Sequence, residues 1–390
     1  MNQYRIKSEN INRKSIYIFG AHSRARTLAV YLTELYPDIS IEAFLTNNTE
    51  ENPTEINGVP VLNLSTGITM NGVTDASDII HTDIPVFIGT RGVFHAQISE
   101  HLRALGFTDI YPVTVELDLH LRNDFLKCYF AKQGRDFAKI DDFAGDSNRD
   151  VLEEVGEDET DGSVAVYVAK SIFDKSLTVP YELASYEKEI QVGAALTQQR
   201  LAEEICVDNV GDNISHKNKQ YCELTALYWI WKNVVEDIIG LVHYRRHFIL
   251  PKNWQQIMVE RGIDVILPVP LYVEPSLETN YKSRHDGSDL DYLFEYVRRQ
   301  DEAEYERLKQ FFGKGLYSPC NMFIMRKDVL CDLCEWMFPL LDAVVAHGGQ
   351  KEDSYLNRYP GFLSERLLSY FFEKNRDKYK MVYADKNFLA

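Results

Sequence analysis

The chain is short of positive charge, of cysteine and of long apolar runs. Its 390 residues include 42 basic and 59 acidic side chains, a formal net charge of -17. A general nucleic-acid-binding protein needs a basic face, so this composition argues against that class of partner. No apolar stretch approaches the ~18 residues that a membrane-spanning helix requires. We therefore expect a protein without membrane-spanning segments.

Cysteine is equally sparse. The six cysteines are scattered, and only Cys331 and Cys334 form a C-x-x-C pair. That pair lies in an apolar helical run without a second pair, so one helix face explains it better than zinc or redox chemistry does. Because no secretory signal is recognisable, we expect reduced thiols and a cytoplasmic location, with the inner face of the membrane as an alternative.

The first part of the chain has the pattern of a Rossmann-like domain, but it lacks the glycine fingerprint. A strand over 14–19 leads through a glycine turn into a helix from about Thr27 to Leu35, and a second strand covers 39–45. His22 stands where close approach to a pyrophosphate requires glycine, and no acid ends the second strand. An NAD-dependent oxidoreductase is therefore disfavoured. Two alternatives stay open for this domain, namely nucleotide binding through Gly20, Ser23, Gly89 and Arg91, or a scaffolding role.

An acidic segment separates this domain from the rest. Residues 141–161 contain ten acids and one base, a composition typical of solvated linkers. We predict three parts: a Rossmann-like, doubly wound domain over 1–140, an acidic linker over 141–162 and a second α/β domain over 163–390.

The most informative stretch is GLVHYRRHF, from Gly240 to Phe248. It begins as a buried strand and breaks into His243, Tyr244, Arg245, Arg246 and His247. Two guanidiniums and two imidazoles are costly to bury, and the carboxyl ends of strands are where α/β proteins bind ligands. Because arginine recognises phosphate in a planar, bidentate way, we expect this cluster to bind an anionic group, most simply a diphosphate. An arginine pair held by structural carboxylates is the alternative.

A polar loop over 208–217 precedes a predicted helix over 218–233, for which Ser215 is a suitable N-cap. The start of such a helix favours anions. The residues that we expect there are Asp212, Asn213, His216, Lys217 and Asn218.

Two later residues are also candidates. Asn321 lies at the start of a predicted strand over 317–325, and Glu365 lies in a helix that we expect to begin after Asn357–Phe362 (NRYPGF). Asn321 could be a simple turn residue, and Glu365 could be a charge that complements the helix dipole. A single long helix is expected over 289–312.

With these segments in view, the second domain resembles a family of bacterial glycosyltransferases with an uncharacterised domain, encoded in capsule, exopolysaccharide and lipopolysaccharide clusters. The resemblance lies between Val164 and Ala390, and the first domain looks like the Rossmann-like domain often fused ahead of it. The matching stretches are DNVGDNISHKNKQYCELTALYWIWKN, GLVHYRRHF, DVILPVPLYV, NYKSRH, YSPCNMFIMRK and NRYPGFLSERL. The resemblance implies a GT-A-like α/β fold and the transfer of a hexose, with galactofuranose as one candidate, onto surface polysaccharide.

The resemblance also implies roles for residues. The donor, a nucleotide-sugar expected to carry UDP, would contact Lys170, Asp212, Asn213, Lys217, Asn218, Tyr244, Arg245, Arg246 and Asn321. The acceptor, a glycan or lipid-linked glycan, would contact Asn280, Arg284 and His285. Contact with membrane assembly machinery is a further expectation.

The expected catalytic residues are Glu365 and His243. We favour Glu365 as the base, because desolvation in a closed cleft restores basicity to a carboxylate, whereas His243 is needed beside the phosphate.

GT-A enzymes usually end the middle strand with D-x-D, which holds a divalent metal. Here that position reads His243 to Arg246, and a fixed cation can neutralise the leaving UDP as the metal does. We therefore expect no cofactor and no metal, with Asp212 or Asp264 as ligands in the alternative. A non-catalytic nucleotide-sugar-binding or scaffolding protein is the second functional hypothesis.

Overall fold

The structure is a computed structural model, and it describes residues 15–47, 52–64, 80–145 and 163–389. The chain folds as two compact units, one ending at Phe137 and one starting at Ala138. Each unit has its own sheet.

The first unit is built on a largely parallel sheet whose described strands have the order β3-β4-β2-β1-β5-β6. Parallel pairing joins β4 to β2, β2 to β1, β1 to β5 and β5 to β6, and only β3 runs antiparallel. The sheet thus extends in both directions from β1, as in a doubly wound fold. The strands are β1 (Ser15–Phe19), β2 (Ser40–Thr46), β3 (Glu55–Ile56), β4 (Val59–Asn63), β5 (Val86–Ile88) and β6 (Ile110–Pro112).

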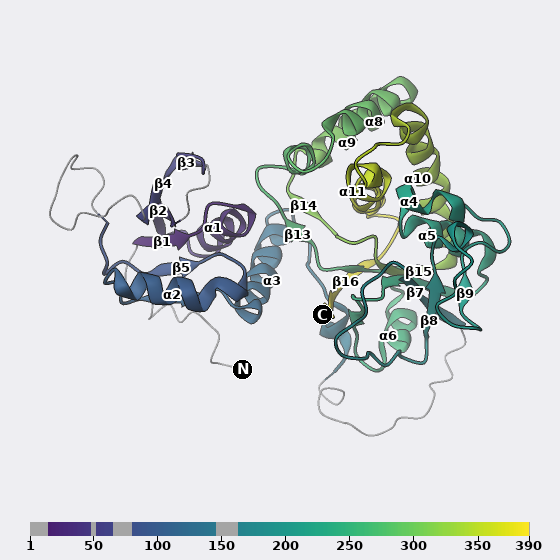
Figure 1. Ribbon diagram of the computed structural model, residues 1–390, viewed down its shortest axis with the longest axis horizontal. Helices are drawn as coiled ribbons and strands as arrows, with labels where there is room; N and C mark the ends of the chain where they lie inside the picture. The colour runs from purple at the N-terminus through teal and green to yellow at the C-terminus, as the bar shows by residue number, and fades with distance from the viewer. Residues whose placement is uncertain (1–14, 48–51, 65–79, 146–162, 390) are drawn as a thin grey trace. The chain divides into compact units, whose positions relative to one another are not determined.

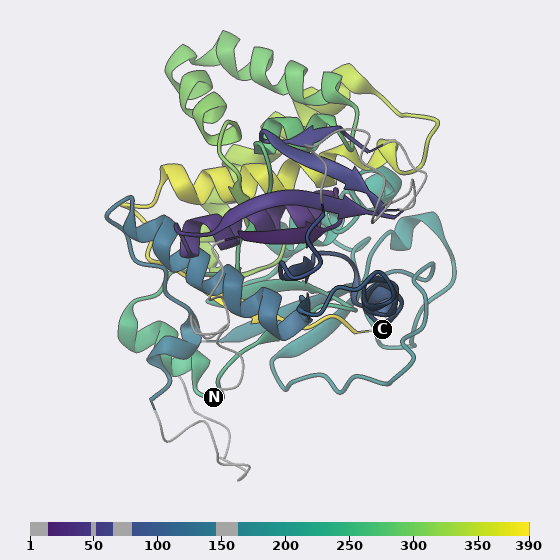
Figure 2. The same cartoon turned by 90° about the vertical axis from the view of Figure 1, so that its left-hand side faces the viewer.

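Helices cover both faces of this sheet (Figures 1 and 2). On one face, Ile98 and Leu102 of α2 pack with Tyr17 and Phe19 of β1. Helix α1 packs against helix α3, and the ring of Tyr31 in α1 contacts the ring of Phe125 in α3. The helices are α1 (Ser23–Leu35), η2 (Gly92–Phe94), α2 (His95–Ala104) and α3 (Val115–Ala131).

Helix α1 begins at Ser23, about four residues before the predicted start, and it lies very close to the sheet. A Cβ on Gly89 would lie 2.9 Å from the Cα of Ala25. Gly20 has φ of +118°, a conformation that glycine adopts at low cost. These glycines thus serve a tight strand–helix turn.

The second unit begins earlier than the predicted domain. Ile140, in η3 (Ile140–Phe143), is fully buried in its core. The amine of Lys139 lies 2.7 Å from the carboxylate of Asp385, and Lys139 bridges to Tyr383. The start of the acidic segment is therefore part of this unit, and positions 146–162 of that segment lie outside the described residues.

The second unit has a mixed sheet with the strand order β11-β16-β12-β15-β10-β7-β8-β9. Strands β10, β7, β8 and β9 are parallel neighbours, whereas β15 runs antiparallel to β10. The carboxyl ends of β7, β8 and β10 therefore share one edge with the start of β15. The strands are β7 (Val164–Lys170), β8 (Glu187–Gln191), β9 (Cys206–Val207), β10 (Ile238–His243), β11 (Phe248–Ile249), β12 (Val265–Pro268), β15 (Phe323–Arg326) and β16 (Met381–Lys386), and a separate two-stranded sheet joins β13 (Leu271–Tyr272) to β14 (Leu316–Tyr317).

Helices lie on both sides of this sheet (Figure 1). Helix α6 packs Trp254, Ile257 and Met258 against one face, and the long α10 contacts β10 and β15. The helical segments are η5 (Ala194–Leu196), η6 (Ser215–Lys217), α4 (Asn218–Tyr221), α5 (Leu224–Asn233), α6 (Trp254–Arg261), α7 (Leu277–Lys282), α8 (Gly287–Gln300), α9 (Glu302–Phe312), α10 (Lys327–Gly348), η7 (Leu356–Arg358) and α11 (Tyr359–Lys374).

Two predicted helices are interrupted, which corrects the sequence-based prediction. The helix expected over 218–233 breaks at Cys222, whose φ is +50°. The helix expected over 289–312 breaks at Asp301, whose carboxylate accepts hydrogen bonds from the N–H groups of Ala303 and Glu304 and so starts α9. An apolar helical period continues through such a break, so periodicity alone does not reveal it.

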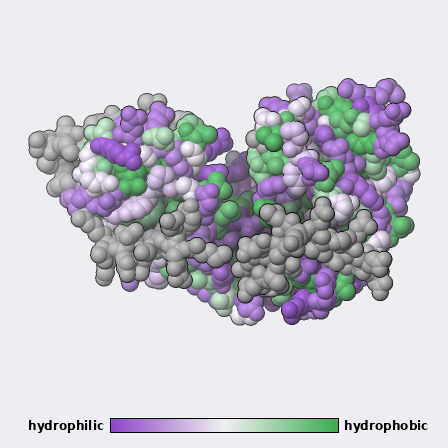
Figure 3. Space-filling view, turned by 90° about the horizontal axis from the view of Figure 1, so that it is seen from below, coloured by the Kyte–Doolittle hydropathy of each residue, from purple (hydrophilic) through white to green (hydrophobic). Residues whose placement is uncertain are grey.

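Hydrophilic side chains dominate the face seen in Figure 3, with small apolar patches between them. Of the helices in the described ranges, none combines the length and apolar character that crossing a bilayer demands.

Candidate functional site

A pocket of about 510 Å³ opens in the second unit at the carboxyl ends of β7, β8 and β10. Ligand sites of α/β proteins lie at this edge, and the volume is in the range of small-molecule sites. Its lining comes from Ala169, Ser171, Phe173, Asp174, Val192, Leu196, Asn218, Lys219, Cys222, Glu223, His243, Tyr244, Arg246, Cys320, Arg358, Gly361, Phe362 and Glu365.

The strand end that the sequence singled out forms one wall of this pocket. After β10 the chain makes a tight turn, in which the N–H of Arg246 donates to the carbonyl of His243 at 2.9 Å. The N–H of Tyr244 donates to the carbonyl of Ala169, which ties the turn to β7. The turn presents His243, Tyr244 and Arg246 to the pocket.

The two arginines of this turn have different surroundings. Arg246 lines the pocket, whereas Arg245 is absent from the lining and its guanidinium lies 5.2 Å from the ring of Tyr244. Within the described part of the chain, neither guanidinium donates a hydrogen bond or forms an ion pair, and the Nε of Arg245 is buried without a partner. Arg246 is thus the cation of this turn that a ligand in the pocket would meet.

His247, the last member of the cluster, is buried away from the pocket. Its Nδ1 lies 2.7 Å from Oε1 of the buried Glu187, and its ring stacks on Tyr181 at 3.9 Å. Its surroundings are those of a core residue.

A single residue, Cys320, joins the two predicted catalytic side chains. The Nε2 of His243 lies 2.6 Å from the carbonyl oxygen of Cys320, and the N–H of Cys320 donates to Oε1 of Glu365 at 2.8 Å. A carbonyl only accepts, so Nε2 of His243 carries a proton and donates it to this bond.

Glu365 lies deeper in its helix than predicted. Helix α11 begins at Tyr359, because Pro360 and Gly361 are already helical, so Glu365 is in the second turn. The dipole argument for the first turn does not apply there. Its side chain is only 19% exposed and Oε2 lies 3.1 Å from Nη1 of Arg366. Burial raises the pKa of Glu365, and the charge of Arg366 and the Cys320 N–H partly offset that rise.

A second carboxylate, Glu223, faces the same pocket. It follows the break at Cys222, and its Oε1 accepts a hydrogen bond from Nδ2 of Asn321 at 2.9 Å. Asn321 is fully buried and its amide is also bonded to Gly361 and Ser364. Asn321 is therefore behind the pocket wall, where it orients Glu223.

Backbone strain is concentrated at this wall. Among the described residues, the non-glycine positions with positive φ are Asn57, Cys222, Cys320 and Asn321. Three of these four surround Glu223 and Glu365. Residues in this region cost free energy and gather at functional sites.

The polar loop over 208–217 is built around a buried carboxylate. Asp208 accepts hydrogen bonds from the N–H groups of Gly193 and Ala194 and from the hydroxyls of Ser215 and Thr225. Ser215 is therefore committed to Asp208 and does not cap a long helix. Helix α4 has four residues, so the predicted anion site at a helix start is not formed.

Several predicted donor residues lie outside the pocket lining. The carboxylate of Asp212 accepts from the hydroxyl of Tyr228, and Asn213 bonds within its own turn. Lys217 pairs with Asp342 and Lys170 with Glu189. Asn218 does line the pocket, where its amide also donates to the carbonyl of Cys222.

The three predicted acceptor residues are also absent from the lining. Asn280 is buried and accepts from Arg366, and Arg284 is exposed. His285 is stacked on Phe362, a lining residue, with ring centroids 4.0 Å apart. Burial lowers the pKa of His285 to about 4.

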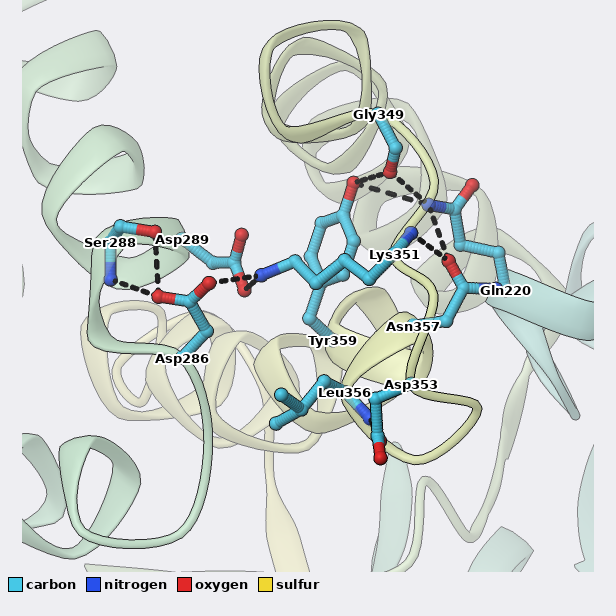
Figure 4. Close-up of polar contacts among 10 residues, drawn as sticks. All are labelled: Gln220, Asp286, Ser288, Asp289, Gly349, Lys351, Asp353, Leu356, Asn357 and Tyr359. Atoms are coloured by element: carbon cyan, nitrogen blue, oxygen red, sulfur yellow. Dashed lines mark hydrogen bonds and ion pairs between the residues drawn. The ribbon is translucent and has the colours of Figure 1, made fainter.

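A polar network around Lys351 supports the segment that leads into α11 (Figure 4). The Lys351 ammonium pairs with Asp286 and Asp289, which anchors it to the start of α8. The backbone N–H of Lys351 donates to Oδ1 of Asn357, and the amide of Gln220 donates to the carbonyl of Gly349 and to the hydroxyl of Tyr359. This network fixes the segment that carries Arg358 and Phe362 to the pocket.

In the described ranges, no three His, Cys, Asp or Glu side chains are grouped as a metal site would require. Asp264, the alternative metal ligand, accepts from the N–H of Lys380 and pairs with Arg326.

The pocket residues that the sequence analysis missed include Phe173, Asp174, Glu223 and Arg358. Phe173 and Asp174 follow the strand over 164–170, and the same strand-end argument that singled out Arg246 could have identified them. Glu223 and Arg358 carried no such signal, because each belongs to a segment whose direction depends on distant contacts.

Residues 172–376 match the family model described as "Domain of unknown function (DUF4422)". A solved structure titled "WbbM bifunctional glycosytransferase apo structure" has a TM-score of 0.50 and 26% sequence identity over 58% of this chain. The match spans 45% of that longer chain. A search of curated proteins found no match. The observed architecture is that of an α/β glycosyltransferase fold.

Proposed function

Because the chain belongs to the DUF4422 family, and because its pocket combines cations with carboxylates at a strand edge, we propose that it is a glycosyltransferase. Its donor is a nucleotide-sugar, with UDP as the expected nucleotide. The observation that carries this proposal is the pocket itself, in which Arg246 and Arg358 face the same space as Glu223 and Glu365.

The diphosphate of the donor binds at the cationic side. Among the described residues Arg246 makes no hydrogen bond or ion pair, and its guanidinium lies 5.2 Å from the ring of Phe388. Arg358 donates through Nε to the sulfur of Cys222, which leaves the rest of its guanidinium for a ligand. Guanidinium and phosphate match in charge and geometry. Tyr244 and His243 complete this side of the pocket.

The nucleobase binds at the mouth. Phe173 is 78% exposed although it lines the pocket, and an exposed aromatic ring beside a ligand site offers a stacking surface. Asp174 lies next to it and its carboxylate accepts from the N–H of Ser171.

The chemistry follows from this arrangement. A carboxylate removes the proton of an acceptor hydroxyl, which then attacks the anomeric carbon, while the guanidiniums stabilise the charge on the departing UDP. Fixed cations can fill the role of a metal ion, so we propose transfer that needs no divalent metal. The transferred sugar is a hexose, with galactofuranose as one candidate.

We propose as acceptor a growing surface polysaccharide, free or linked to lipid, and a place of action in the cytoplasm or at the inner face of the membrane. The similarity to a glycosyltransferase of known structure supports the reaction class. The finer assignments rest on the resemblance of the sequence motifs.

A donor screen tests the proposal. The full chain is incubated with a panel of UDP-hexoses, including UDP-galactofuranose, and UDP release is measured with and without a chelator. We expect release from one donor, unchanged by the chelator. Donor binding without release from any donor would support the non-catalytic alternative, and loss of release with chelator would refute the metal-independent mechanism.

A further inference from the structure

Two carboxylates face the pocket, and their hydrogen bonds distinguish them. Glu365 has both oxygens engaged, one by the N–H of Cys320 and the other by Arg366. Glu223 has one oxygen bonded to Asn321, and its other oxygen has no hydrogen bond or ion pair among the described residues.

From this difference we infer that Glu223 is the general base of the transfer, an inference that rests on the proposed function. A base must have a lone pair within hydrogen-bond reach of the proton that it removes. Glu223 lines the pocket, and its second oxygen, which has no hydrogen bond or ion pair among the described residues, keeps its lone pairs for such a proton.

The backbone around Glu223 is arranged to place this carboxylate. Cys222 has φ of +50°, and it separates α4 from α5 instead of letting one helix continue. Glu223 is the residue before α5, yet its side chain makes no capping hydrogen bond to that helix. A carboxylate at a helix start normally gains from capping or from the dipole, so its direction into the pocket is maintained by other contacts.

Those contacts form a buried chain of hydrogen bonds through Asn321. Asn321 donates to Glu223, while its own oxygen accepts from the hydroxyl of Ser364 at 2.9 Å. Asn321 also has a positive φ of +49°. Two strained residues, Cys222 and Asn321, thus hold one carboxylate in place, and Asn321 is a positioning residue for it.

Glu365 then has a different task. It holds the N–H of Cys320, whose carbonyl holds His243. Its side chain holds the backbone of Cys320 in place at this wall of the pocket. The acceptor hydroxyl is deprotonated by Glu223 instead.

The step balances in atoms and electrons. The acceptor O–H proton moves to the free oxygen of Glu223, and the acceptor oxygen bonds to the anomeric carbon. The bond from that carbon to the phosphate oxygen breaks, and its electron pair leaves with UDP beside Arg246 and Arg358.

The test uses the full chain and UDP release from the donor that the wild type accepts, with water as acceptor when no saccharide is added. Glu223→Gln keeps the shape of the side chain and an oxygen for Asn321. We expect kcat to fall about 10²- to 10⁴-fold, the scale of general-base catalysis, with the Kd for UDP and the melting temperature unchanged. Glu223→Asp, which keeps a carboxylate, should recover part of kcat.

Glu365→Gln is measured in parallel, and we expect it to lose less kcat than Glu223→Gln. If Glu223→Gln retains more than a tenth of wild-type kcat, or if Glu223→Asp is no better than Glu223→Gln, the inference is overturned. A Glu223→Gln variant that loses UDP binding or melts early would overturn it too, since a structural role explains that result. An inactive wild type would instead count against the proposed function.

Discussion

The half-buried imidazole of His285 should make the second unit sensitive to mild acid. Its ring stacks on Phe362 at 4.0 Å and on Tyr355 at 5.6 Å. Its Nδ1 is buried without a partner. Burial lowers the pKa of His285 from 6.5 to about 4, and the charges of Arg366 and Arg284 act in the same direction.

The sign of the effect follows from linkage. Between pH 6.5 and about 4 the unfolded chain binds a proton at this position and the folded chain does not, so stability falls as the pH falls. One pKa unit corresponds to about 1.4 kcal/mol. Between pH 7 and pH 5, with allowance for the partial exposure of the ring, His285 should cost about 1–2 kcal/mol of unfolding free energy.

The assay is urea unfolding followed by tryptophan fluorescence at both pH values. All four tryptophans, Trp229, Trp231, Trp254 and Trp336, belong to the second unit, so the signal reports that unit. His285→Phe keeps an aromatic ring in the stack and removes the titration. Its loss of stability between pH 7 and pH 5 should therefore be smaller than that of the wild type by about 1–2 kcal/mol.

Tyr355→Phe is the matched control, because it alters the same stack without removing a group that titrates in this range. It should keep the wild-type pH dependence. If His285→Phe and the wild type lose the same stability between the two pH values, the burial argument is wrong.

Three further predictions concern the pocket, its support and the boundary between the units. Arg246→Ala should weaken UDP binding, measured by calorimetry, about ten- to a hundredfold, since a hydrogen bond to a charged group contributes about 1.5–3 kcal/mol. Arg245→Ala should change the affinity less than threefold, and equal losses in the two variants would contradict the geometry. Asp208→Asn should lower the unfolding free energy by about 3 kcal/mol, because two N–H groups and two hydroxyls converge on that carboxylate; an unchanged denaturation midpoint would contradict its supporting role. A fragment over 138–390 should be more stable than one over 163–390 by about 2 kcal/mol or more, because only the longer fragment keeps the fully buried side chain of Ile140 in the core. Equal melting temperatures of the two fragments would argue against this.

The chain's local patterns were sufficient for much of the fold. The buried strand expected at the start of GLVHYRRHF is present as part of β10 (Ile238–His243), and the structure confirms the expected α/β class. The whole cluster from His243 to His247 was expected to face a ligand, and the structure puts three of its five side chains, those of His243, Tyr244 and Arg246, in a pocket with Asn218 and Glu365. Such patterns are readable because burial imposes a short period on neighbouring residues.

Tertiary structure alone decided which of the charged side chains share that pocket. Arg245 and Arg246 are adjacent in sequence, yet a tight turn sends only Arg246 to the lining. Glu223 looked like one position of a long helix, and only the break at Cys222, together with Asn321 from a turn almost a hundred residues later, directed it to the site. Positive φ at a non-glycine residue costs free energy that local sequence does not supply. It persists because long-range packing and hydrogen bonds hold it, and those contacts are set by the assembled fold.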